Sequence, residues 1–444
     1  MNFQEAQEYL DSLQQHKLKL GLEAMEGFLD KVSRPDKKIR CVHIAGTNGK
    51  GSVSVNIVTL LGRAGYRVGL FTSPHLSSVR ERFRINDQFI SENDFARHAT
   101  RVREALGDEM ITYFEFTTAL ALLWFEEANV DLVVLETGLG GRLDATNVVK
   151  PLVAVITNVS MDHEAYLGND LRSVAFEKAG IIKEKVPVVT GVHDDISREV
   201  VTERCRQMHA PMYLFGRDFY AEDAGKEGWH WQSDNEGLQG TYENLRCGMR
   251  GDYQRANSSL AIGVLALLRH QGFAFSEEDI RQGLLAVRWP GRLEYIALQG
   301  KNKIRVEDQG QEDDTTLRYL VDGAHNPAGV QSLVKTLAKE YSYKRLIVLW
   351  GAMEDKDLRQ TVGPIAEMAS NIILTKPQGE RAADPSMLLD ALPEALQKRC
   401  CLIPDGKEAL HFAQEQATAE DLIVIAGSLY LIGEMRNYLV GTLV

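Results

Sequence analysis

A glycine-rich stretch, "GTNGKGS" at residues 46–52, is where the residue types first suggest chemistry. It follows an apolar run and precedes a stretch with helical periodicity, which is where a phosphate-binding loop belongs. Backbone N–H groups of such a turn, with the dipole of the following helix, form a pocket for anionic oxygen. Lys50 would add charge on the β- and γ-phosphates, and the Ser52 hydroxyl could bind Mg²⁺ or a phosphate oxygen.

The same stretch departs from the Walker pattern G-x-x-x-x-G-K-[ST] in two places. Only two residues separate Gly46 from Gly49, and Gly51 stands between Lys50 and Ser52. A plain strand-to-helix turn is the alternative interpretation of this stretch. The rest of the chain must therefore decide whether residues 46–52 bind a nucleotide.

Polar residues also follow four other apolar runs, which are expected to be strands of a parallel sheet. Ligands collect at the carboxyl ends of the strands in such a sheet. One shared site explains polar clusters at four strand ends better than chance does. The residues concerned are Ser73, Glu136, Asn158 with Asp162 and His163, and Asp322 with His325.

Each of these residues also has a simpler interpretation. Glu136 could cap the glycine turn after it, although a carboxylate ending a buried strand needs a partner and a cation is a natural one. Ser73 could be a turn residue, and His163 is the weakest metal ligand of the three because Mg²⁺ prefers oxygen to imidazole. Lys178 would by default be a solvated helical lysine. Arg292 could pack on the nearby tryptophan or reach a phosphate.

The elements that must position these residues alternate between strands and helices. Nearly continuous apolar runs are typical of strands buried on both faces of a parallel sheet, and they indicate an α/β doubly wound architecture. Residues 52–65 have helical spacing and end in glycine. Residues 216–253 break the alternation and predict antiparallel hairpins. The predicted strands lie in the runs 39–45, 67–73, 131–136, 152–158, 186–191, 317–322, 345–351, 371–376 and 421–428.

Bulk properties limit the class of protein. A chain of 444 residues predicts two domains, with a boundary near residue 288 and a hinge at Pro290 and Gly291. The net charge of −12 argues against nonspecific nucleic-acid binding. Five cysteines without a C-x-x-C pair predict reduced thiols in a cytoplasm. Neither a signal peptide nor a membrane span is expected.

Taken together, eight ordered motifs resemble those of the folylpolyglutamate synthase and dihydrofolate synthase family, within the Mur ligase superfamily. The matches run from roughly residue 20 to residue 435. "ETGLGGRLDATN" and "DGAHNP" are the most specific of them. The eight motifs are "GTNGKGS", "TSPHL", "ETGLGGRLDATN", "DHEAYLG", "EKAGII", "WPGRLE", "DGAHNP" and "GSLYLIGE".

The resemblance implies a fold and a reaction. Residues 1–287 would form an ATP-binding P-loop domain with a mostly parallel sheet and a smaller antiparallel subregion, and residues 288–444 a Rossmann-like glutamate ligase domain, with the active site in the cleft between them. ATP would phosphorylate a carboxylate to an acyl phosphate, and the amino group of L-glutamate would attack it. Such an enzyme takes part in folate biosynthesis and one-carbon metabolism.

The resemblance also implies roles for particular residues. Lys178 matches the family's carbamylated lysine, which would hold a second Mg²⁺, and K⁺ is a further expected cofactor. The catalytic residues would be Lys50, His163, Lys178 and Arg292. The magnesium ligands would be Ser73, Glu136, His163 and Lys178. The ATP contacts would be Gly46, Thr47, Asn48, Gly49, Lys50, Gly51, Ser52, Asn257, Arg292 and Asp322.

The segments that match substrate-binding motifs are less uniform. For the pterin they are "LGLEAM" at 20–25, Tyr113 and Phe114 within "TYFEF", and Leu143, Asp144 and Ala145. The first departs from the family pattern, which often carries a basic residue at position 24. His325 and Ser428 are weaker candidates for binding the incoming L-glutamate.

The sequence leaves several alternatives open for the substrate and the function. The acceptor is dihydropteroate, a reduced folate or both, and the resemblance suggests a monomer. A Mur-type UDP-muramyl ligase is one alternative, although the 46–52 loop leaves no room before it for a UDP-binding domain. A P-loop ATPase switch or transporter is another, and a catalytically dead nucleotide-binding protein a third.

Overall fold

The computed structural model describes residues 1–13, 21–300, 304–305 and 313–444, which form two compact units. The first unit comprises Met1–Pro74, Val79–Gly248 and Gln254–Arg288. The second comprises Trp289–Val444 and two short segments, His75–Ser78 and Met249–Tyr253. The predicted domains, 1–287 and 288–444, stay predictions, since the two short segments pack with the second unit.

An eight-stranded sheet forms the centre of the first unit, in the order β4-β3-β2-β5-β1-β6-β7-β8. Its strands from β2 to β8 pair in parallel, and β3 and β4 continue the sheet in antiparallel pairing at one edge. The bounds are β1 Cys41–Ala45, β2 Val68–Phe71, β3 Phe83–Ile85, β4 Gln88–Phe89, β5 Leu132–Glu136, β6 Val153–Ile156, β7 Val188–Thr190 and β8 Met212–Leu214.

The register of this sheet aligns the strand ends that the sequence singles out. Ile44 of β1 lies opposite Glu136 of β5, and Phe71 of β2 lies opposite Leu135. Ala45 lies opposite Ile156 of β6. The carboxyl ends of β2, β5, β1 and β6 therefore meet at one edge of the sheet, as the sequence predicts for a parallel arrangement.

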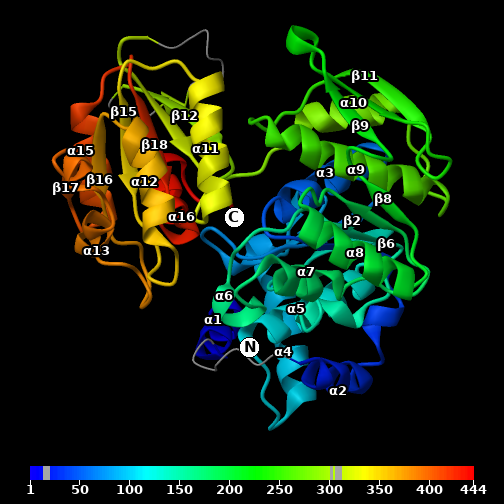
Figure 1. The fold of residues 1–444 in the computed structure, drawn as a ribbon. Helices are drawn as coiled ribbons and strands as arrows, with labels where there is room; N and C mark the ends of the chain where they lie inside the picture. Colours follow the sequence, from blue (N-terminus) through cyan, green and yellow to red (C-terminus); the bar gives the residue numbers. More distant parts are fainter. Residues whose placement is uncertain (14–20, 301–303, 306–312) are drawn as a thin grey trace. The chain divides into compact units, whose positions relative to one another are not determined.

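Helices cover both faces of this sheet (Figure 1). One apolar core packs α1, α2, α4 and α5 against it, and another packs α7 and α8. Side chains of Ser91, Thr112, Asp170 and Asp194 accept backbone N–H bonds and so start α4, α5, α7 and α8. The bounds are α1 Phe3–Ser12, α2 Glu23–Lys31, α3 Lys50–Arg63, α4 Glu92–Leu106, α5 Tyr113–Glu127, α6 Glu164–Leu167, α7 Leu171–Ala179, α8 Asp195–Gln207, α9 Tyr253–Arg269 and α10 Glu277–Ala286.

A second, three-stranded antiparallel sheet belongs to the first unit and confirms the break predicted over residues 216–253. Its strands are β9 Tyr220–Asp223, β10 Trp229–Ser233 and β11 Gly240–Leu245. Trp231 of β10 is fully buried, and its indole N–H donates to the Ser259 carbonyl of α9 over 3.3 Å. One aromatic side chain therefore fixes this small sheet to α9.

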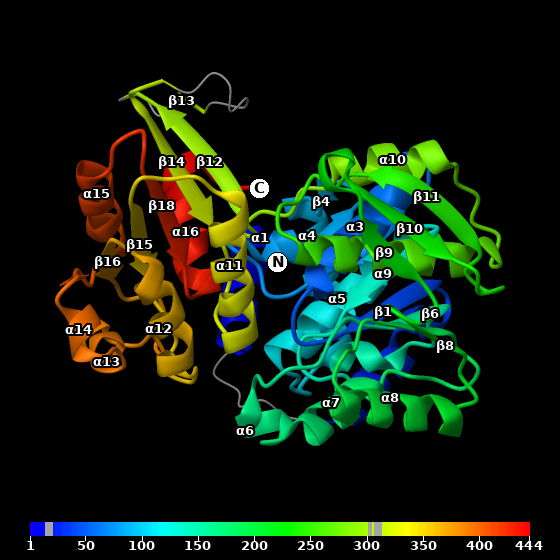
Figure 2. The ribbon, with the colours of Figure 1, turned by 45° about the horizontal axis from the view of Figure 1, so that its top comes forward.

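The second unit has a seven-stranded sheet in the order β13-β12-β14-β18-β15-β16-β17. Helices α11, α12 and α13 pack on one face, and α15 and α16 on the other (Figure 2). The strands are β12 Glu294–Gln299, β13 Ile304–Arg305, β14 Thr316–Val321, β15 Leu346–Trp350, β16 Asn371–Leu374, β17 Cys400–Leu402 and β18 Leu422–Ala426. The helices are α11 Pro327–Glu340, α12 Leu358–Met368, α13 Pro385–Asp390, α14 Glu394–Gln397, α15 Gly406–Gln416 and α16 Leu429–Val440.

The two short segments make specific contacts inside the second unit. Lys339 donates to Asp252 over 2.7 Å, and the Gly251 N–H donates to Glu340 over 3.2 Å. The Leu76 carbonyl lies only 2.1 Å from where a Cβ on Gly433 would be, so α16 approaches this backbone closely.

Two further expectations concern the cysteines and the lengths of the helices. All five cysteines are free, as reduced thiols require. Within the described ranges, the helices are all too short or too polar to cross a lipid bilayer.

Two backbones touch where residues 137–145, which follow β5, meet the last turn of α7. A Cβ on Gly141 would lie 2.9 Å from the Glu177 carbonyl oxygen, and one on Gly180 would lie 2.3 Å from the Arg142 Cβ. Neither position has room for a side chain. The two glycines therefore allow the 137–145 loop and α7 to pack backbone to backbone.

Gly180→Ala is expected to lower the free energy of unfolding by about 1–3 kcal/mol, because the new methyl group overlaps the Arg142 backbone. Gly27 in α2 has no atom near its absent Cβ, so Gly27→Ala is the matched control. That control is expected to raise stability by up to about 1 kcal/mol through helix propensity. Thermal unfolding of both variants measures the difference, and equal melting temperatures would contradict this account.

Candidate active site

The 46–52 loop joins β1 to α3. At two of its glycines there is no room for a side chain. A Cβ on Gly46 would lie 1.9 Å from the Thr157 hydroxyl, and one on Gly49 would lie 2.6 Å from the Asn257 side-chain oxygen. Gly49 also has φ +84°, a backbone conformation that favours glycine. Helix α3 begins at Lys50, directly after this residue, so the loop ends at a helix N-terminus as a phosphate site requires.

The residues after β6 hold this loop in place. Thr47 N–H donates to the Asn158 carbonyl over 3.0 Å, and Asn48 N–H donates to the Asn158 side chain over 2.9 Å. The Thr157 hydroxyl donates to the Asn48 carbonyl over 2.6 Å. The sequence places Asn158 among the polar residues at the strand ends, but it gives no sign of a role for Thr157, because only the fold brings β6 beside β1.

Lys50 lies folded over its own loop. Its Nζ donates to the carbonyls of Gly46 and Thr47 over 3.0 and 3.1 Å. Ser52 is buried in the first turn of α3. The structure therefore brings the predicted lysine and hydroxyl to the same turn of backbone.

Asn257 reaches the 46–52 loop from α9, as the prediction requires. It is 6% exposed, and its side-chain oxygen is the group nearest to Gly49. Its Nδ2 donates over 2.9 Å to Gln254, one helical turn earlier, which holds the amide in orientation. Gln254 escaped sequence analysis, although its spacing of three residues from Asn257 places both on one helix face.

The predicted magnesium ligands lie beyond the carboxyl ends of the parallel strands. Glu136 ends β5 and is 5% exposed, and Ser73 follows the neighbouring strand β2. Both offer oxygen, which fits Mg²⁺. His163 precedes α6 with φ +54°, its side chain is 40% exposed, and its Nε2 lies 3.8 Å from Asp162.

Acidic, histidine and cysteine side chains do not gather in threes with metal-binding spacing in the described part of the chain. An ion held here would therefore complete its coordination with hydroxyl, water or phosphate oxygen, as Mg²⁺ usually does.

Lys178 is buried in the last turn of α7, so its interpretation as a solvated lysine is wrong. The residue is 3% exposed. Burial, followed by the charge of Lys50, lowers the pKa of Lys178 to about 7, while Asp162 and Asp144 oppose that shift. Helical spacing in the sequence could not show this burial, because the 137–145 loop packs against the last turn of α7 from a distant part of the chain.

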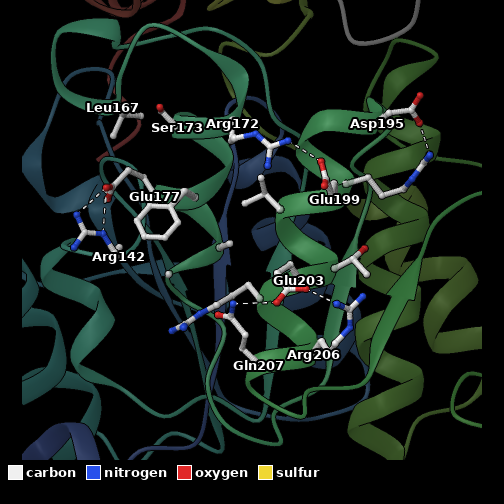
Figure 3. A pocket seen from close by; sticks show the side chains of 17 residues that line it. Arg142, Leu167, Arg172, Ser173, Glu177, Asp195, Glu199, Glu203, Arg206 and Gln207 are labelled. Atoms are coloured by element: carbon white, nitrogen blue, oxygen red, sulfur yellow. Dashed lines mark hydrogen bonds and ion pairs between the residues drawn. The ribbon is translucent and has the colours of Figure 1, made fainter.

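The 137–145 loop is fixed to α7 by a second contact besides its glycines. The Arg142 guanidinium donates to one carboxylate oxygen of Glu177 from Nε over 3.1 Å and from Nη2 over 2.8 Å (Figure 3). The Arg142 N–H donates to the Glu177 carbonyl over 2.7 Å. These bonds fix the residue next to Lys178.

The same pair lies at the rim of a hollow of about 1050 Å³ between α7 and α8 (Figure 3). Charged side chains line much of it, with the half-exposed ring of Phe176 among them. None of the predicted site residues lines this hollow. Its size therefore does not identify it as the active site.

The predicted pterin residues gather around the 137–145 loop. The Phe114 ring packs against Gly138, where a Cβ would lie 2.6 Å from its Cζ. Tyr113 lies beside it, with the Arg82 guanidinium 5.2 Å from its ring centre. Leu143 and Ala145 lie in the loop itself. Of the 20–25 segment, residue 20 lies outside the described residues, and Met25 is buried in the core of the first unit.

Asp144, also predicted to bind substrate, uses its carboxylate within the loop. It is 5% exposed and accepts from the N–H groups of Gly138 and Leu139, each over 2.8 Å. Burial raises the pKa of Asp144, and these hydrogen bonds oppose the rise. The carboxylate therefore ties the beginning of the loop to its end.

In the second unit, three predicted residues, Asp322, His325 and Ser428, lie after β14 and β18, which are neighbouring parallel strands. The fourth, Arg292, precedes β12, the antiparallel partner of β14. Asp322 accepts from the N–H groups of Leu293 and Ala324 over 2.8 and 2.9 Å. Burial raises the pKa of Asp322, and Arg292 opposes this with its charge. Ser428 is 2% exposed and caps α16.

The two loops that carry these residues are bonded to each other. Gly427 N–H donates to the Ala324 carbonyl over 3.0 Å. His325 is oriented by a 2.8 Å bond between its Nδ1 and the Gly323 carbonyl, so Nδ1 carries the proton. Arg292, Asp322, His325 and Ser428 thus gather at one edge of the second sheet.

Comparison with known proteins adds what geometry alone does not give. The model of the Mur ligase middle domain matches residues 44–265, and that of the Mur ligase, glutamate ligase domain, matches residues 305–429. A "Dihydrofolate synthase/folylpolyglutamate synthase" of Bacillus subtilis is 34% identical over 447 residues, covering 98% of this chain and 99% of that protein.

Solved structures agree with these matches. "E.coli FolC in complex with DHPP and ADP" has a TM-score of 0.86 at 28% identity, covering 99% of this chain and 97% of that one. A bifunctional folylpolyglutamate synthase/dihydrofolate synthase from Yersinia pestis, complexed with AMPPNP and Mn ion, has a TM-score of 0.84 at 30% identity and covers 99% and 98%.

Gly49→Ala is expected to weaken ADP binding at least about tenfold, because the methyl group displaces Asn257 and strains the loop. Gly65→Ala is the matched control: Gly65 has φ +91° and no atom near its absent Cβ. Both variants carry backbone strain, and only the first touches the loop. Calorimetric titration with ADP separates them, and an equal loss of affinity would contradict the role given to Gly49.

Proposed function

This chain belongs to the folylpolyglutamate synthase and dihydrofolate synthase family of Mur ligases, and we propose that it joins L-glutamate to a folate-type carboxylate through an acyl phosphate made from ATP. One observation carries the proposal. At the carboxyl edge of the first sheet lie the 46–52 loop, Glu136 and the 137–145 loop. Lys178 is near enough to Lys50 that the charge of Lys50 lowers its pKa. The edge thus offers a phosphate cradle, a carboxylate and cations together.

The first step needs the γ-phosphoryl group held and its charge neutralised. The N–H groups of the 46–52 loop and the N-terminus of α3 bind the phosphates, and Lys50 leaves its two loop carbonyls to contact the β- and γ-phosphates. Asn257, next to Gly49 in the structure, orients the nucleotide against the loop. Phosphorylation converts a poor acyl donor into one with a good leaving group.

Magnesium supplies charge neutralisation for phosphoryl transfer when it is bound. Ser73, Glu136 and His163 are the residues that would hold it. The two oxygen ligands suit the ion, and the imidazole is assigned by resemblance.

Lys178 is proposed to carry a carbamate. A neutral amine attacks carbon dioxide, and a pKa of about 7 leaves much of this lysine neutral at physiological pH. The carbamate would reverse the charge at this buried position and give a second magnesium ion an oxygen ligand. K⁺ stays a prediction of the resemblance alone.

The remaining assignments follow the gathering of residues in the second unit. Arg292 and Asp322 are assigned to the nucleotide, and His325 and Ser428 to L-glutamate. The pterin is assigned to Tyr113, Phe114 and the 143–145 segment. We take the acceptor to be dihydropteroate, a reduced folate or both, and the enzyme to be a cytoplasmic monomer.

ADP release should require both a pterin acid and L-glutamate, because the acyl phosphate forms only on the acid and is consumed only by the amine. The assay contains ATP and Mg²⁺ with dihydropteroate in one series and tetrahydrofolate in another, each with and without L-glutamate. A steady ATPase rate without either substrate would support a P-loop switch instead. Turnover only with a UDP-muramyl substrate would support the cell-wall alternative.

Protein equilibrated with ¹³C-labelled carbon dioxide and Mg²⁺ is expected to show a carbamate signal by NMR that is stronger at pH 8 than at pH 6. Below a pKa of about 7 the protonated Lys178 lacks the lone pair that attacks carbon dioxide. Lys178→Ala should lose the signal, whereas Lys185→Ala, at an exposed lysine, should keep it.

Lys178→Ala should also lose ligase activity and recover part of it with short carboxylates that mimic a carbamate. Full activity in this variant, or an unchanged carbamate signal, would contradict the assignment of Lys178.

A further inference from the structure

A buried histidine in β1 has no role in the mechanism above. His43 lies three residues before the 46–52 loop and is fully buried. Its neighbours along the strand, Val42 and Ile44, are apolar, as a strand covered on both faces demands. Burying an imidazole here carries a free-energy penalty of desolvation unless a hydrogen-bond partner offsets it.

The partner is Thr146, in the 3₁₀ turn Ala145–Val148 that follows the 137–145 loop. The His43 Nε2 lies 2.8 Å from the Thr146 hydroxyl, which is itself fully buried. The same hydroxyl donates to the Asp144 carboxylate over 2.5 Å. A chain of hydrogen bonds therefore runs from β1 through Thr146 to Asp144.

The direction of this chain follows from donor count. A carboxylate only accepts, and a threonine hydroxyl has one hydrogen, so Thr146 gives its proton to Asp144 and must receive one from His43. His43 therefore carries its proton on Nε2. Burial, with the nearby charge of Lys183, lowers the pKa of His43 to about 3, so the ring is neutral. Within the described part of the chain, its Nδ1 has no hydrogen-bond partner, so Thr146 is the only group that this imidazole serves.

At the other end, Asp144 transmits this restraint to the backbone. One carboxylate oxygen accepts from Thr146, through both its hydroxyl and its N–H group. The second oxygen accepts from Gly138 and Leu139, where the Phe114 ring packs. A rotation of this carboxylate would release the first residues of the loop.

We propose that His43 and Thr146 are positioning residues that orient the Asp144 carboxylate, and thereby shape the 137–145 loop for the pterin acid. The inference rests on the proposed function, because the loop is assigned to the pterin there. If His43 and Thr146 act in this way, changing them alters the affinity for the pterin acid and leaves the affinity for the nucleotide unchanged.

His43→Gln and His43→Asn test this, since both keep an amide but only the longer side chain reaches the position of Nε2. His43→Asn is expected to raise KM for the pterin acid about tenfold with KM for ATP changed less than about threefold, and His43→Gln to restore most of the difference. Thr146→Val and Thr146→Ser form a second pair with the same expected contrast. Combining His43→Asn with Thr146→Val should add little to either change alone, because both break one chain.

His98, a second fully buried histidine, lies in α4 and provides the control for a purely structural effect. His98→Asn should lower the melting temperature while leaving both KM values unchanged. Equal rises of both KM values in His43→Asn, or no rise in either, would overturn the inference.

Hydrogen exchange of the peptide covering residues 137–146, followed by mass spectrometry, reads the same restraint without turnover. Exchange should be faster in His43→Asn than in His43→Gln, and equal rates would overturn the inference. A wild-type protein that makes no ADP with either pterin acid would instead contradict the proposed function.

Discussion

The backbone-to-backbone contact between the 137–145 loop and the last turn of α7 is the constraint on which the candidate site depends. It exists only because Gly141 and Gly180 lack side chains, and it brings together two segments more than thirty residues apart. Through it, the loop that follows Glu136 packs against the backbone of the α7 turn that carries the buried Lys178. The Arg142–Glu177 pair at the rim then secures the same contact from outside. This one contact thus joins the loop that follows Glu136 to the turn of α7 that carries Lys178.

Burial of charge at a sheet edge is costly, and this site shows how the chain limits the cost. Lys178 responds with a lowered pKa, whereas Asp144 keeps a network of four hydrogen bonds around its carboxylate. Lys178 therefore owes its state to burial and to Lys50 on another element, whereas Asp144 owes its state to its own loop and the turn that follows. Catalytic groups with shifted pKa values commonly arise in this way, through desolvation and a specific partner.

Much of the architecture could be predicted from sequence, because buried parallel strands are apolar along their whole length and end in the residues that matter. Each predicted run contains a strand, and the 46–52 loop lies where its glycines place it. The antiparallel edge strands β3 and β4 escaped prediction because they are short and half-polar. Three supports of the site, Thr157, Gln254 and His43, escaped prediction for another reason. The partners of Thr157 and His43 are more than a hundred residues away in the sequence, and Gln254 alone resembles an ordinary helical residue.

The short segments His75–Ser78 and Met249–Tyr253 belong to the second unit, although each is flanked in the sequence by residues of the first. The polypeptide passes from one unit to the other five times, so no single break in the gene separates them. A recombination event at residue 288 would transfer a second unit without the backbone that packs against Gly433 and without the partners of Lys339 and Glu340. Such a fragment would have gaps in its own packing. Exchanging the second unit as a module that begins at residue 288 would therefore remove these contacts.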